Sequence, residues 1–74
     1  MFLVIRHTDR SNAYRWIVLE QLEEYKAGLE KTKNYAKGFS RSRVSLIEMD
    51  PIGNFEILST YKSKERQLEH VFLA

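Results

Sequence analysis

The chain has 74 residues and no cysteine, and its twelve basic and ten acidic residues give a formal net charge of +2. This length predicts a single domain, and the absence of cysteine excludes disulfide bridges and thiolate zinc sites. The longest apolar runs are far too short for a membrane span or a signal-peptide core. We therefore expect one small cytoplasmic domain, residues 1–74, whose small core is supplemented by self-association or by a partner.

The N-terminal residues Phe2 to Ile5 form a continuous apolar stretch with two β-branched side chains. Such a stretch is typical of a strand that is buried on both faces, and we expect it at the centre of the sheet. The next residues are polar, and four of them can cap a helix: Thr8, Asp9, Ser11 and Asn12. The sequence therefore predicts that a helix begins shortly after the first strand.

Apolar residues then recur at helical spacing as far as residue 36, and the stripe consists of Tyr14, Val18, Leu22, Tyr25, Leu29, Thr32 and Ala36. This pattern predicts one long helix that packs on the sheet and ends near Gly38, with Gly38 in the left-handed conformation. On such a helix, Trp16 lies away from the apolar stripe, with Leu19 nearby. A tryptophan on the outer face of a helix favours a contact with a partner. The alternative is that the amino-terminal loop or residues 71–73 fold over it.

Residues 43–61 have the pattern of a β-hairpin that turns at residues 50–53. Pro51 fixes φ at the first corner, Asp50 can bond the turn backbone, and Gly53 tolerates the left-handed conformation that closes the loop. The turn pairs Asp50 with Asn54. Continued outward, this register predicts the pairs Met49/Phe55, Glu48/Glu56, Ile47/Ile57, Leu46/Leu58, Ser45/Ser59, Val44/Thr60 and Arg43/Tyr61.

Both faces of this hairpin are partly apolar. The odd-numbered face is the predicted core face, because it carries a contiguous cluster of Ile47, Met49, Phe55 and Ile57. The other face carries Val44, Leu46 and Leu58. We expect those three side chains to be covered by the C-terminal segment or by a second copy of the chain.

The residues after Tyr61 allow two interpretations. Leu68, Val71 and Phe72 share a helical face, which favours a short helix, whereas His70 to Leu73 could equally form an added edge strand. The predicted fold class is α+β. We expect a small βαββ domain in which one long helix packs on a three-stranded, mainly antiparallel sheet, followed by the short C-terminal helix or edge strand.

The first strand ends in an Arg-His pair within Val4-Ile5-Arg6-His7-Thr8, just before the predicted helix start, where backbone N–H groups can hold a phosphate. These five residues resemble the opening motif of the histidine phosphatases, in which the nucleophilic histidine follows the first strand. Thr8 stands where that family has glycine, and the chain has roughly half the length of such a catalytic domain. The resemblance implies a small phosphate-handling enzyme that uses His7. The competing interpretation is that Arg6 and His7 are ordinary residues at a strand end.

Basic residues gather at one end of the predicted fold, because residues 31–43 contain five of them and no acidic residue. The hairpin register adds two lysines at that end and places Glu48, Asp50 and Glu56 at the opposite end. Six of these seven basic residues form what we call the basic pole: Lys33, Lys37, Arg41, Arg43, Lys62 and Lys64. Such a pole suits the phosphate backbone of a nucleic acid and equally an acidic protein surface.

The leading functional hypothesis is a non-catalytic binding protein that docks on a protein partner, as a homodimer, and modulates or inhibits that partner. Its expected contact residues are Trp16, Leu19, Glu23, Val44, Leu46 and Leu58. A small chain without a cofactor motif is typical of the inhibitors that phages and other mobile elements encode. The alternative is a nucleic-acid-binding accessory protein that uses the basic pole. Neither hypothesis requires a cofactor, a metal ion or a catalytic residue.

Overall fold

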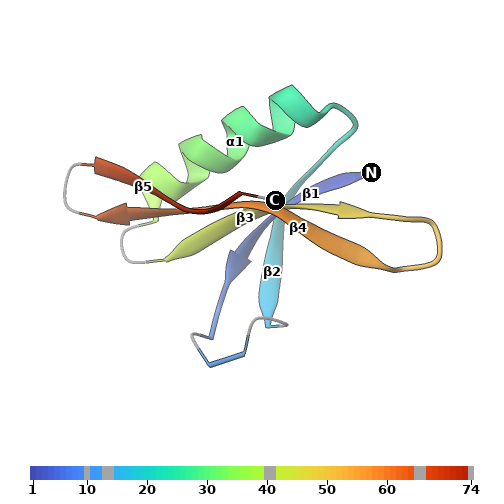
Figure 1. Ribbon diagram of the computed structural model, residues 1–74, viewed down its shortest axis with the longest axis horizontal. Coiled ribbons are helices and arrows are strands. Elements are labelled where there is room, and N and C mark those ends of the chain that lie inside the picture. Colours follow the sequence, from blue (N-terminus) through green and yellow to red (C-terminus); the bar gives the residue numbers. More distant parts are fainter. Residues whose placement is uncertain (10, 13–14, 40–41, 65–66, 74) are drawn as a thin grey trace.

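In a computed structural model, the described residues form one α-helix packed on one face of a five-stranded antiparallel sheet (Figure 1). The structure describes residues 1–9, 11–12, 15–39, 42–64 and 67–73. The elements are β1 (Phe2–His7), β2 (Trp16–Leu22), α1 (Tyr25–Gly38), β3 (Arg43–Met49), β4 (Phe55–Lys64) and β5 (Gln67–Leu73). The strand order is β2-β1-β3-β4-β5. The α+β class is confirmed, but the sheet has two more strands than the three predicted.

Residues 16–22 form strand β2, so the prediction of one long helix from about residue 14 is wrong over its first half. Trp16, Ile17 and Val18 are aromatic or β-branched and therefore favour a strand, although their spacing also fits a helix. β2 pairs antiparallel with β1 from Phe2 opposite Leu22 to His7 opposite Trp16. Pairing with β1 thus satisfies the backbone groups on one side of β2. Tyr14 lies outside the described residues.

The polar residues between β1 and β2 close a turn and do not cap a helix. The carboxylate of Asp9 accepts hydrogen bonds from the backbone N–H and the hydroxyl of Ser11, at 2.9 and 2.7 Å. These bonds lower the pKa of Asp9. Side chains that cap helices also bond turn backbones, so their presence does not distinguish the two structures. The helix instead begins at Tyr25, after Glu24.

The hairpin turn between β3 and β4 confirms the prediction. Gly53 has a φ of 94° and donates its N–H to the carbonyl of Asp50 at 3.1 Å. The Asp50 carboxylate accepts the N–H groups of Ile52 and Asn54 at 3.1 and 2.9 Å. Gly38, by contrast, is the last residue of α1 and lacks a positive φ, so its predicted left-handed conformation is not adopted.

A one-residue shift interrupts the β3–β4 register between Leu46 and Ile47. The predicted pairs hold from the turn to Ile47 opposite Ile57. Leu58 is then the extra residue of a bulge. Beyond it the observed pairs are Leu46/Ser59, Ser45/Thr60, Val44/Tyr61 and Arg43/Lys62, each one position further along β4 than predicted.

The helix packs on the hairpin face that was not predicted to be the main core. Val44 and Leu46 are fully buried in a cluster with Val4, Ala36 and Tyr61. Leu58 packs against the same cluster. These side chains are covered by α1 and are not available to a second copy of the chain, because a helix that begins at Tyr25 lies across the even-numbered positions of β3.

The opposite face carries a second, smaller core. Leu3, Ile5 and Ile47 are buried there, and four partly buried side chains pack against them: Trp16, Met49, Phe55 and Ile57. The rings of Trp16 and Phe55 meet edge to face, with centroids 4.8 Å apart and planes at 90°. Trp16 lies on β2 and Phe55 on β4, and β1 and β3 lie between these two strands in the sheet. The contact forms because the β1–β2 hairpin runs across the β3–β4 hairpin (Figure 1).

The C-terminal segment forms strand β5 and not the short helix, so the edge-strand alternative is confirmed. It pairs antiparallel with β4, from Ser59 opposite Leu73 to Lys64 opposite Gln67. Leu68 packs against the core under the helix. With β5 included, β3 is the central strand of the sheet. β1, which was expected at the centre, is the second of the five strands.

Two helix glycines offer a matched test of this packing. A Cβ added at Gly28 would lie 2.8 Å from Cδ1 of the buried Leu46, whereas a Cβ at Gly38 would meet nothing within 4 Å. Gly38→Ala should raise the free energy of unfolding by up to about 1 kcal/mol through helix propensity. Gly28→Ala should lower it by about 1 kcal/mol or more, because overpacking outweighs that gain. Urea denaturation measures both, and equal stabilisation by the two substitutions would contradict the packing.

Candidate binding surfaces

Arg6 and His7 lie on opposite faces of β1, as successive residues of a strand must. Nε of Arg6 donates to the Ser42 hydroxyl at 3.2 Å, and its guanidinium lies 4.5 Å from the Phe39 ring centroid. His7 instead contacts Ser45 on the other face. A second strand follows β1, so the helix start that a phosphate would need is absent beside this pair in the described residues. The geometry on which the histidine-phosphatase resemblance rests is therefore not formed.

His7 belongs to a chain of hydrogen bonds that crosses three strands. Its Nε2 lies 2.7 Å from the Ser45 hydroxyl, which lies 2.6 Å from the hydroxyl of Thr60. A histidine beside a serine can activate a nucleophile. Ser45 is fully buried, however, and shares its hydroxyl with Thr60. This chain therefore ties β1, β3 and β4 together beneath the surface and does not present a nucleophile to a substrate.

Strand β2 lies at one edge of the sheet and exposes two adjacent apolar side chains. Ile17 is 47% exposed and Val18 is 54% exposed. Neither residue was predicted to be exposed on a strand, because the apolar spacing predicted a helix for this segment. The run of large apolar residues at 16–18 could have identified them. An unbroken apolar run fits a strand with apolar side chains on both faces, because successive side chains of a strand point to opposite faces.

Three residues predicted to contact a partner lie on or beside β2. Trp16 and Leu19 are half-buried, each packed against a different face of the sheet, and Glu23 is exposed just before the helix. The other three predicted contact residues, Val44, Leu46 and Leu58, lie under α1. The structure thus divides the predicted set between the edge of the sheet and the core.

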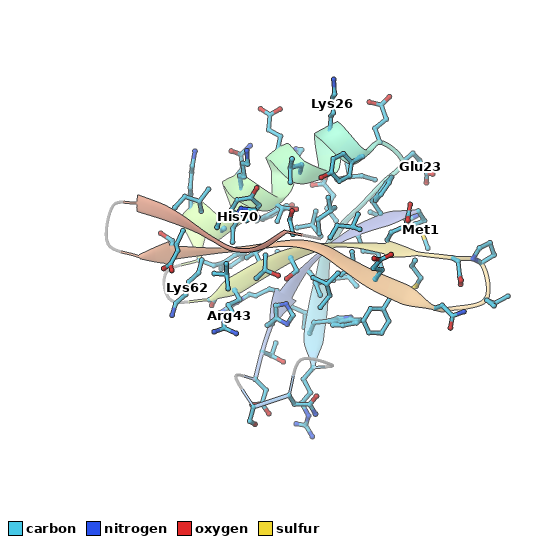
Figure 2. The ribbon with its side chains drawn as sticks, viewed as in Figure 1. Met1, Glu23, Lys26, Arg43, Lys62 and His70 are labelled. Carbon is cyan, nitrogen blue, oxygen red and sulfur yellow. The ribbon has the colours of Figure 1, made fainter. Side chains whose placement is uncertain are left out.

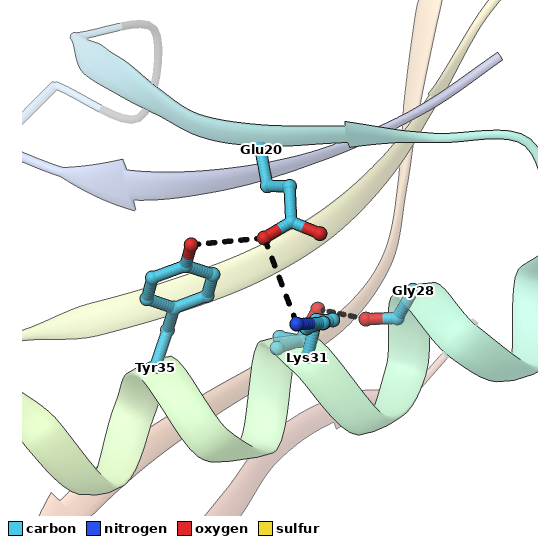
Figure 3. Close-up of polar contacts among 5 residues, drawn as sticks. Glu20, Gly28, Lys31 and Tyr35 are labelled. Carbon is cyan, nitrogen blue, oxygen red and sulfur yellow. Dashed lines mark hydrogen bonds and ion pairs between the residues drawn. The ribbon is translucent and has the colours of Figure 1, made fainter.

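The inner end of β2 is held to the helix by Glu20. Its carboxylate accepts a hydrogen bond from the Tyr35 hydroxyl at 3.0 Å and lies 4.0 Å from Nζ of Lys31 (Figure 3). The hydrogen bond to Glu20 raises the pKa of the Tyr35 hydroxyl. These contacts hold β2 against α1, whereas Ile17 and Val18, nearer its start, are exposed.

The structure places the described members of the basic pole at one end of the molecule. Arg43 and Lys62 lie directly opposite each other on β3 and β4, and Figure 2 shows their side chains together. Lys37 is exposed in the last turn of α1, and Nζ of Lys33 lies 5.7 Å from the centroid of the Tyr61 ring. The other two members are Lys64, at the end of β4, and Arg41, which lies outside the described residues.

The acidic residues of the hairpin tip lie at the other end of β3 and β4. Glu48 and Glu56 are opposite each other, as predicted, and with Asp50 and Phe55 they help to line a pocket of about 400 Å³. Among the described residues, no group of three or more His, Cys, Asp or Glu side chains is arranged to hold a metal ion. The charges of the hairpin are therefore segregated by sign between its two ends.

The chain matches no protein-family model, and neither curated proteins nor solved structures are significantly similar to it. Within the part of the chain that the structure describes, no helix has the length and apolar character needed to cross a membrane.

Two buried serines test whether the hydrogen-bond chain has a structural role. Ser45 and Ser59 are both fully buried, but the Ser59 hydroxyl has no hydrogen-bond partner among the described residues. Ser45→Ala should lower the free energy of unfolding by about 1–3 kcal/mol, because His7 and Thr60 lose the hydroxyl they share. Ser59→Ala should be neutral or stabilising by up to about 1 kcal/mol. Thermal unfolding compares the two, and a larger loss at Ser59 would exclude this assignment.

Proposed function

We propose that this protein is a non-catalytic binding protein that acts as a homodimer, joined through the edge of β2, and modulates a protein partner by occupying its surface. The observation that carries the proposal is the exposed pair Ile17 and Val18 on a terminal strand. A terminal strand presents unpaired backbone N–H and C=O groups to which another strand can bind.

The composition of β2 supports its use as an interface. Residues 16–19 contain no charged side chain, although natural edge strands are commonly protected by charge. The other terminal strand, β5, exposes Glu69 and His70 beside Val71. Of the two edges, β2 therefore has the composition of a strand that pairs, and β5 that of a strand that remains in solvent.

The local geometry of β2 limits how a second strand can pair with it. Leu19 is an extra residue between Val18, which lies opposite Ile5, and Glu20, which lies opposite Val4. A bulge of this kind bends an edge strand and ends regular pairing. The regular part of the edge is therefore residues 16–18.

A second copy of the chain fits this short segment. In an antiparallel pairing about a two-fold axis at Ile17, each Ile17 meets its counterpart, and Trp16 of one copy meets Val18 of the other. Opposed residues of an antiparallel pair lie on the same face, so the exposed parts of Ile17 and Val18 both become covered. The three-residue length favours a dimer that dissociates at low concentration.

Val18→Lys tests this interface, because lysine on an edge strand opposes pairing. We expect the wild-type protein to be a dimer at micromolar concentration and Val18→Lys to be monomeric and still folded. Ile52→Lys is the matched control, since Ile52 is 84% exposed in the turn between β3 and β4 and belongs to neither edge strand. That variant should remain dimeric.

Sedimentation velocity across a concentration series measures these states, with circular dichroism to verify folding. A wild-type protein that stays monomeric at all concentrations would refute the proposal. A dimer that both lysine substitutions weaken equally would refute the assignment to β2.

A further inference from the structure

The hairpin of β3 and β4 carries a like-charged pair at each end. Arg43 lies opposite Lys62 at one end, and Glu48 lies opposite Glu56 at the other. Like charges directly opposed across an antiparallel pair destabilise it by roughly 0.2–1 kcal/mol. If one basic residue of the first pair and one acidic residue of the second pair exchanged places, both repulsions would be removed. The sequence therefore keeps an arrangement that opposes stability, which is expected where a surface has another role.

Within the described residues, the positive pair is only partly balanced by its neighbours. Glu69 of β5 lies opposite Lys62 on its other side, but no ion pair forms among the described residues between either Arg43 or Lys62 and a carboxylate. Arg43 is exposed. An anion bound at this position would relieve the repulsion and gain charge-assisted hydrogen bonds.

The helix extends the positive surface around the end of the molecule. Lys37 lies in the last turn of α1, and the Ser42 N–H donates to the carbonyl of Phe39 at 3.2 Å, which holds the helix end beside the start of β3. Lys33 lies on the helix side, over Tyr61. Cations on opposite faces of a sheet cannot converge on one small anion, whereas they can contact successive charges of a polyanion.

The aromatic rings near the basic pole are already occupied by contacts within the chain. Tyr61 is only 7% exposed, and its ring stacks on His70 with centroids 4.6 Å apart. Phe39 stacks on Tyr35 at 6.4 Å and lies under the guanidinium of Arg6. Proteins that bind single strands stack bases on accessible aromatic rings. The described rings at this end do not offer such a platform.

We infer that the described cations of the basic pole, Lys33, Lys37, Arg43 and Lys62, bind the phosphate backbone of double-stranded nucleic acid, without selecting a base sequence. Each cation that neutralises a phosphate contributes about −0.9 to the slope of log K against log salt concentration. The four members with described side chains, Lys33, Lys37, Arg43 and Lys62, therefore predict a slope of about −3.6. This inference does not depend on dimerisation through β2.

The test is fluorescence anisotropy of a labelled DNA duplex of about 20 base pairs, titrated between about 50 and 200 mM salt. The double substitution Arg43→Gln with Lys62→Gln should reduce the steepness of the slope by about 1.8, from two lost contacts. Arg15→Gln with Lys26→Gln is the matched control. It removes the same formal charge from exposed residues outside the basic pole, and Figure 2 shows Lys26 pointing away from the sheet. The control should keep the wild-type slope.

Three results would overturn the inference. The wild-type protein fails to bind the duplex at the lowest salt, or the control loses as much slope as the double variant, or single-stranded DNA of the same length binds more tightly than the duplex. Polyglutamate is included as a competing probe. If it binds and the duplex does not, the surface meets an acidic protein and the inference is wrong. The double variant should melt no lower than the wild type, so misfolding cannot imitate lost binding.

Discussion

A sheet with two apolar faces needs cover on both, and the described part of this chain supplies a single helix. α1 covers Val4, Val44 and Leu46. The other face is closed by the edge-to-face contact between Trp16 and Phe55, beneath which Ile5 and Ile47 are fully buried. That contact requires residues 16–22 to be a strand and requires the β1–β2 hairpin to cross the β3–β4 hairpin. The cover of this second face therefore depends on this pair of rings.

The same constraint determines which side chains remain available for binding. Trp16 packs against the second core, whereas its neighbours Ile17 and Val18 are exposed at the edge of the sheet. The apolar edge belongs to β2, whereas Arg43 and Lys62 lie together at one end of β3 and β4 (Figure 2). The two proposed contacts therefore use different residues, and each set can be altered by its own substitutions.

Local rules predicted the features that depend on a few adjacent residues. The turn at 50–53, the register from Met49 to Ile47 and the buried strand that begins at Phe2 all follow from backbone preference and apolar pattern. The assignment of residues 16–22 failed because their apolar spacing fits both periods and only pairing with β1 decides between them. The Leu58 bulge has no clear local pattern. Because neither β2 nor the bulge was predicted, the sequence did not indicate which face of the β3–β4 hairpin the helix covers. It also did not indicate which of the predicted contact residues are buried.

A double-mutant cycle on Trp16 and Phe55 tests the central claim most directly. Each substitution to alanine should lower the free energy of unfolding, and the pair should show a coupling of about 0.5–1.5 kcal/mol, as expected for an aromatic pair in contact. The control cycle combines Trp16→Ala with Tyr61→Ala, which lies in the core on the other face and should be additive. Additivity between Trp16 and Phe55, with a tryptophan emission that quenchers reach freely, would show that the two rings do not close the second face.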